Sequence, residues 1–185
     1  MIAHATETCY GFACDLTNPA AVERLFLIKK RSSKFPVSAL FPSIEEAKRY
    51  VEWNEKAEEL AAKHLPGPLT LILPMRMDAP QKIFPVPLVA SRESPVTTLG
   101  IRISSHPTAM ELAQRFGGPI STTSANIGGE KEAYSADEIM RIFSSEKEKP
   151  DIIIDSGTLP STPPSTILRI GEGKVEIVRR GPLIF

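Results

Sequence analysis

The sequence predicts an α+β fold, a mixed α/β arrangement in which helices lie on both faces of one mixed β-sheet. Apolar runs typical of strands are interleaved along the chain with segments whose apolar residues recur at helical spacing. Some strand candidates are joined by hairpins or long loops instead of helices, which favours a mixed sheet over a purely parallel one. The chain has 185 residues and no internal repeat, so we expect residues 1–185 to form a single domain.

Composition is that of a globular protein and not of a polycation. The chain is 42% hydrophobic and carries 22 basic and 22 acidic residues. This balance argues against a protein that wraps nucleic acid, although a local patch of basic residues is compatible with a net charge of zero. No run reaches transmembrane length and the first residues lack the pattern of a signal peptide, so we expect a cytoplasmic protein without membrane contact. Cys9 and Cys14 form neither a zinc set nor a disulfide framework, and we expect buried thiols.

The first half of the chain alternates strand and helix patterns. Asn18 and Pro19 are typical of a helix start, because asparagine caps the free N–H groups and proline is preset for the first turn. Ser43 opens a capping box with the glutamate three residues later. We expect strands over residues 2–5, 37–41 and 69–73, and helices over 19–30, 43–51 and 54–64.

The second half begins with a proline-rich stretch, 74–96, that we expect to be a long surface loop and a candidate flap. A helix over 107–116 should bury Met110, Leu112, Ala113 and Phe116 and end at Gly117. Ser135 caps the next helix. We expect further elements as a strand over 97–103, a helix over 136–143, a strand over 151–155 and a hairpin that pairs 166–170 with 175–179.

Two short strand-like runs end in polar groups and glycines, over 98–102 and 119–129. Hydroxyls, backbone N–H groups and an arginine suit the binding of phosphate or carboxylate, although serine, asparagine and glycine after a strand also form ordinary turns. Arg102 lies in an apolar strand pattern and should face an anion or solvent. The cations at 29–31 either complement a helix dipole or bind phosphates. No nucleotide-binding glycine motif and no metal-ligand spacing is present, so no metal site is expected.

Taken in order, the polar motifs resemble those of the YrdC-type threonylcarbamoyl-AMP synthases along nearly the whole chain. Each motif is short, and the ordered set carries the resemblance. The motifs are Thr6-Glu7-Thr8-Cys9-Tyr10-Gly11, Lys29-x-Arg31 with Pro36, Leu65-Pro66-Gly67-Pro68-Leu69-Thr70, Thr98-x-x-x-Arg102, Ser124-Ala125-Asn126, Ser165-Thr166 and Arg179-x-Gly181.

The resemblance implies a three-layer, twisted mixed sheet of the YrdC/RibB-like type that encloses a positively lined cavity. It implies that L-threonine, bicarbonate and ATP, with Mg²⁺ on the phosphates, are joined into threonylcarbamoyl-AMP and pyrophosphate. This adenylate is the first step toward the threonylcarbamoyl group (t6A) at adenosine 37 of tRNA, so tRNA or tRNA-modification proteins are possible partners.

Carried over residue by residue, the resemblance divides the site into two sides. It implies catalytic roles for Lys29 and Arg31. The threonine-binding residues it implies are Thr8, Arg102, Thr122 and Ser165. The ATP-binding residues are Lys29, Arg31, Thr98, Ser124, Asn126 and Arg179.

The chain also departs from the family pattern, at Ala5, Phe35, Leu40 and Glu132. An acidic Glu132 facing phosphates would weaken ATP binding unless a cation screened it. Two alternative functions remain open on the sequence. One is a non-catalytic RNA-binding module of the same fold, and the other is a relative that transfers the carbamoyl group of carbamoyl phosphate.

Overall fold

A computed structural model describes residues 1–31, 37–80, 98–171 and 174–185. The helices in these residues are α1 (Pro19–Ile28), α2 (Ile44–Lys48), α3 (Glu55–His64), α4 (Pro107–Phe116) and α5 (Ala136–Phe143). The strands are β1 (Ile2–Ala5), β2 (Tyr10–Ala13), β3 (Ser38–Leu40), β4 (Leu69–Pro74), β5 (Thr98–Arg102), β6 (Ile120–Ser124), β7 (Ile152–Ile153), β8 (Thr166–Ile170) and β9 (Val175–Arg179).

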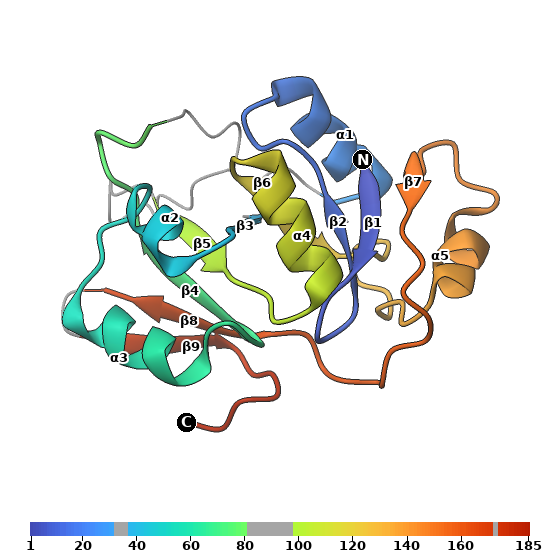
Figure 1. Cartoon of the computed structure of the whole chain (residues 1–185). Helices are drawn as coiled ribbons and strands as arrows, with labels where there is room; N and C mark the ends of the chain where they lie inside the picture. The colour runs from blue at the N-terminus through green and yellow to red at the C-terminus, as the bar shows by residue number, and fades with distance from the viewer. Residues whose placement is uncertain (32–36, 81–97, 172–173) are drawn as a thin grey trace.

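The strands form one mixed sheet, which confirms the predicted fold class. Its nine strands run in the order β7-β1-β2-β6-β3-β5-β4-β8-β9, with β8 and β9 beside β4 at one end and β7 at the other (Figure 1). The pairs β1–β7, β3–β5 and β4–β8 are parallel, and the remaining neighbours are antiparallel. Strands from both halves of the chain therefore alternate in the middle of the sheet.

Local sequence signals set the helix starts and the end of α4 as predicted, whereas α2 ends at Lys48, three residues before the predicted boundary at 51. The Asn18 side chain accepts hydrogen bonds from the N–H groups of Ala20 and Ala21, and Ser43 and Ser135 cap α2 and α5 in the same way. Gly117 ends α4 with a left-handed φ of 69°, a conformation that glycine adopts without steric cost. Helix α1 ends at Ile28, two residues before the predicted boundary.

The main core lies between the middle strands and the helices. Phe12 is fully buried and meets the ring of Phe143 edge to face at 5.5 Å, which fixes α5 against β2. Strand β4 contributes Leu69, Leu71 and Leu73, all fully buried. Both cysteines are buried free thiols, as expected.

The prediction that α4 buries Phe116 is wrong, because its buried face is formed by Ala109 and Ala113. Phe116 is 48% exposed and, with Met1 and Leu112, lines a small apolar hollow beside β1. Phe116 is the last residue of α4, directly before Gly117.

Two strand predictions also need correction. Residues 10–13 form the buried strand β2, which was not predicted because a polar cluster precedes it. Strand β7 spans only Ile152–Ile153 of the predicted 151–155. Most of the predicted 74–96 loop, residues 81–96, lies outside the described residues. The predicted hairpin of 166–170 with 175–179 is confirmed as β8 and β9.

Candidate functional site

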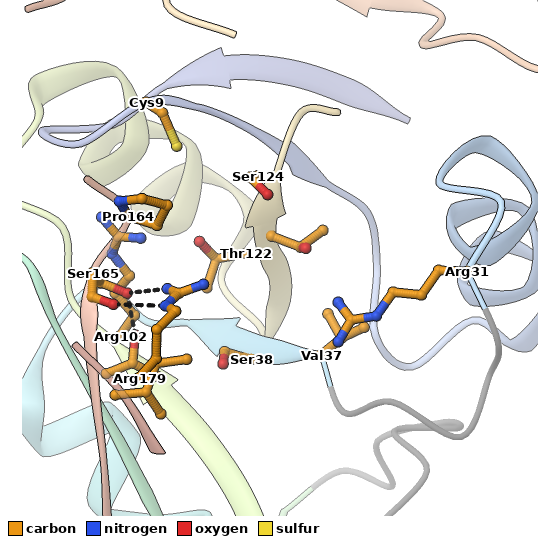
Figure 2. Close-up of a pocket in the computed structure, with 13 residues that line it drawn as sticks. Cys9, Arg31, Val37, Ser38, Arg102, Thr122, Ser124, Pro164, Ser165 and Arg179 are labelled. Atoms are coloured by element: carbon orange, nitrogen blue, oxygen red, sulfur yellow. Dashed lines mark hydrogen bonds between the residues drawn. The ribbon is translucent and has the colours of Figure 1, made fainter. Parts of the chain in front are cut away.

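A cavity of about 120 Å³ lies where the β1–β2 turn meets β3, β5, β6, β8 and β9 (Figure 2). A volume of this size exceeds what a single ordered water needs. Six of the predicted site residues line it, namely Arg31, Arg102, Thr122, Ser124, Ser165 and Arg179. The structure therefore brings together side chains that are up to 148 positions apart, the separation of residues 31 and 179.

Three arginines give the cavity its positive charge. Arg102 and Arg179 lie together with Ser165, whereas Arg31 reaches in from the end of α1 on the opposite side (Figure 2). Loss of solvent lowers the pKa of Arg31 and Arg179 from the usual arginine range. A guanidinium stays charged at neutral pH despite such a shift, so the cavity suits a ligand that is itself negative.

Ser165 fixes the orientation of Arg179. The Nε of Arg179 donates to the Ser165 carbonyl at 3.0 Å, and its Nη2 donates to the Ser165 Oγ at 3.1 Å. The same Oγ lies 2.9 Å from the hydroxyl of Thr70 on β4. Strands β4, β8 and β9 are thus joined at the cavity wall by side-chain hydrogen bonds as well as by the backbone pairing of the sheet.

Arg102 is paired with Glu7, a residue without a predicted role. Its Nη2 donates to Glu7 Oε1 at 2.8 Å and to Thr8 Oγ1 at 2.8 Å. The expectation that Arg102 faces an anion is met by this carboxylate. The signal was present in the sequence, because an arginine in a buried strand requires a partner and Glu7 stands in the polar cluster that follows β1.

Lys29 lies beneath the cavity rim and is absent from the residues that line the cavity. It is 3% exposed, and its Nζ donates to the carbonyls of Ser124 and Asn126 and to the Asn126 side-chain oxygen. Burial, and then the charge of Arg31, lower the pKa of Lys29 to about 7. The lysine therefore holds the loop after β6 in place.

Asn126 stabilises the same loop. Its Oδ1 accepts from Ser124 Oγ at 2.7 Å and from Lys29, and its Nδ2 donates to the Glu130 carbonyl at 2.6 Å. The N–H of Gly128 donates to the Lys29 carbonyl at 2.7 Å. The segment from Ser124 to Glu130 is therefore tied to the end of α1.

The other predicted site residues lie outside the cavity lining. Thr8 is buried behind Arg102 and meets the cavity only through that arginine and through Cys9, which lines it. Thr98 begins β5 and pairs with Pro74, four residues before Arg102 on the same strand. The two residues are about 13 Å apart along the strand at its usual rise.

The four departures from the family pattern fall in different surroundings. Ala5 and Leu40 are fully buried and pack in the core, and Phe35 lies outside the described residues. Glu132 is near the site, since its charge raises the pKa of Lys29 and Arg179 against the larger effect of burial. Glu132 does not line the cavity, but its charge acts on these two cations.

The described residues contain no group of three or more histidine, cysteine, aspartate or glutamate side chains placed to hold a metal ion. Among the same residues, no helix has both the length and the apolar character needed to cross a bilayer.

The whole chain resembles proteins of one family. Residues 1–181 match the Sua5/YciO/YrdC family model, which is described as "Telomere recombination". A putative threonylcarbamoyl-AMP synthase of Methanocaldococcus jannaschii is 34% identical over 176 residues, covering 95% of this chain and 77% of that one. A threonylcarbamoyl-AMP synthase of Idiomarina loihiensis is 30% identical over 171 residues, covering 91% and 86%.

Solved structures show the same fold. P. abyssi Sua5 complexed with L-threonine superposes with a TM-score of 0.84 at 32% identity, covering 98% of this chain and 50% of that one. E. coli YciO superposes with a TM-score of 0.80 at 25% identity, covering 98% of this chain and 82% of that one. This chain thus spans half the length of the Sua5 chain and most of the YciO chain.

Proposed function

We propose, from the premise that this chain belongs to the Sua5/YciO/YrdC family, that it is an L-threonylcarbamoyladenylate synthase, a nucleotidyltransferase. One observation carries the proposal. Arg31, Arg102 and Arg179 converge with hydroxyl groups on one cavity, although they come from distant parts of the chain. Two curated relatives bear the name of this synthase, and a relative of the same fold binds L-threonine.

The proposed reaction joins L-threonine, bicarbonate and ATP. The threonine amine attacks the carbon of bicarbonate and water leaves, which gives a carbamate. A carbamate oxygen then attacks the α-phosphorus of ATP, the bond to the β-phosphate oxygen breaks, and pyrophosphate leaves. The product, threonylcarbamoyl-AMP, supplies the group for adenosine 37 of tRNA, and tRNA-modifying proteins are the proposed partners in a cytoplasmic location.

The protein contributes positioning and neutralisation of charge. We assign Arg102, Thr122 and Ser165 to threonine, with Thr8 acting through Arg102. Arg31, Arg179, Ser124 and Asn126 are assigned to ATP, together with Thr98 at the far end of β5. Mg²⁺ enters on the ATP phosphates as part of that substrate, and fixed guanidinium groups offset the charge that develops as pyrophosphate leaves.

Lys29 serves the ATP side indirectly in this proposal. Its ammonium group is surrounded by the oxygens of Ser124 and Asn126. It therefore holds these two residues in place instead of touching the triphosphate.

Replacing Arg31 with alanine tests the proposal, because it removes the cation that approaches from α1. We expect ATP- and threonine-dependent release of pyrophosphate to fall by about two orders of magnitude, as when a donor to a developing charge is lost. The matched control is Arg169→Ala on β8, whose partner is the exposed Glu176. Pyrophosphate release at the wild-type rate in Arg31→Ala would contradict the assignment.

The same assay separates the two alternative functions. With carbamoyl phosphate supplied, a carbamoyl-phosphate relative would stay active when threonine is omitted, whereas the proposed synthase would stop. An RNA-binding module would release no pyrophosphate and would lose RNA steeply as salt is added.

A further inference from the structure

Glu7 forms a buried ion pair beside the cavity. Its Oε1 accepts from Arg102 Nη2 at 2.8 Å, and the two side chains are 15% and 8% exposed. Solvent screens such a pair far less than a surface pair, and removing one partner leaves the other charge unpaired. The Glu7 carboxylate therefore has a large influence on where the Arg102 guanidinium lies.

The carboxylate of Glu7 is itself held in place. Its Oε2 accepts a hydrogen bond from the hydroxyl of Ser104, which is fully buried. Ser104 Oγ also accepts from the backbone N–H of His106, at the start of α4. Burial acts to raise the pKa of Glu7, but the charge of Arg102 and the bond from Ser104 lower it below the usual range. The carboxylate is thus ionised at neutral pH and anchored to a helix start.

In the guanidinium of Arg102, Nη2 donates hydrogen bonds, whereas Nε has no partner among the described residues. Nη2 contacts Glu7 and the hydroxyls of Thr8 and Thr6, at 2.8, 2.8 and 3.4 Å. Its Nε is buried and has no hydrogen-bond partner among the described residues. An unpaired buried donor on a charged group is costly. Arginine usually meets a carboxylate through two nitrogens, and here Glu7 engages one.

We infer that Glu7 is a positioning residue, which anchors Arg102 through Nη2 so that the rest of the guanidinium receives the carboxylate of the substrate amino acid. This inference rests on the proposed function, in which Arg102 binds threonine. Ser104 and the hydroxyls of Thr6 and Thr8 complete the support of the guanidinium. Glu7 itself touches no ligand in this arrangement.

Replacing Glu7 with alanine and with glutamine tests the inference by calorimetry with L-threonine and, separately, with ATP. Alanine removes the anchor, and we expect threonine to bind about tenfold more weakly, while ATP binding changes less than about twofold. Glutamine keeps an acceptor oxygen in the same place, so it should restore part of the threonine affinity. If Glu7 had a purely structural role, alanine would weaken the binding of both ligands together, and glutamine would not restore the affinity for threonine.

The matched control is Glu176→Ala, which frees Arg169 from an exposed partner at the same 2.8 Å separation and should change neither affinity. If Glu7→Ala does not fold, Ser104→Ala takes its place, because it loosens the carboxylate but leaves the ion pair. Its expected loss of threonine affinity is about threefold. Unchanged or tighter threonine binding in the folded variant overturns the inference.

The readout separates this inference from the proposed function. A wild-type chain that binds L-threonine but releases no pyrophosphate contradicts the synthase, while the binding series still decides the role of Glu7. A wild-type chain that does not bind L-threonine contradicts both.

Discussion

Among single residues, Lys29 shows best how burial alters a predicted role. The sequence marked it as a cation for phosphate, and the structure places its ammonium against three oxygens of the loop after β6. Two of these acceptors are backbone carbonyls about a hundred positions away. No pattern around residue 29 indicates such a contact, so the sequence could not predict that Lys29 holds this loop.

The lowered pKa of Lys29 makes stability depend on pH in a defined direction. Its pKa is about 7 in the folded chain, below the ordinary value of 10.5, so the unfolded chain binds more protons between these values. The free energy of unfolding should therefore gain a contribution as pH rises from about 7 to about 10. Lys29→Met removes the titrating group and should flatten that rise.

Urea unfolding of both proteins at pH 6.5 and 9.5 measures this effect. The difference between wild type and variant cancels the contribution of other groups, such as Cys9, whose pKa is raised by burial. An identical change with pH in both proteins would show that Lys29 does not titrate in this range.

Among the elements, the parallel strands β3 and β5 approach closely at Gly100. A β-carbon at this position would lie 2.5 Å from Ser38 Oγ and 3.1 Å from Ser38 Cβ. Ser38 lines the cavity (Figure 2). The absence of a side chain at residue 100 therefore allows Ser38 its place in the cavity wall.

Gly100→Ala should destabilise the fold by about 1–3 kcal/mol, the usual cost of overpacking, and should weaken ligand binding as Ser38 is displaced. Urea unfolding measures the first effect and calorimetry the second. Adding Ser38→Gly should recover much of the stability, because it removes both close atoms. Gly171→Ala is the control, since a β-carbon there meets nothing within 4 Å. An equal loss in both single variants would rule out the steric explanation.

Helix starts could be predicted from the sequence, and the reason is local. The caps at Asn18, Ser43 and Ser135 depend on residues within one turn. Strand β2 pairs both with the nearby β1 and with the distant β6, and the short β7 pairs with the distant β1. The mixed sheet itself followed from the interleaved patterns, but its strand order did not.

At the scale of the whole molecule, three arginines line the cavity while the chain is neutral overall. Raising salt from about 0.1 M to about 1 M shortens the Debye length from about 10 Å to about 3 Å. We expect the KM for ATP to rise several-fold over this range, while that for threonine, a zwitterion, changes less than about twofold. Initial rates of pyrophosphate release give both constants.

Arg31→Ala supplies the control for the salt series, because its residual activity should depend less steeply on salt. Equal sensitivity of the two constants would mean that salt acts on the fold as a whole. The ordered motifs named six residues that the structure places in the cavity lining. The sequence indicated that Arg102 needs an anion but did not identify Glu7 as that anion, because the pair forms only when β5 meets the first turn.

The cavity is lined both by Cys9, from the turn between the first two strands, and by Arg179, at the end of the last. In the proposed function, a substrate bound between them links the beginning and the end of the polypeptide. At a hundred times its dissociation constant such a ligand adds about 2.7 kcal/mol to the free energy of unfolding. Without the ligand the chain lacks this contribution, so a larger share of it is unfolded and open to proteolysis.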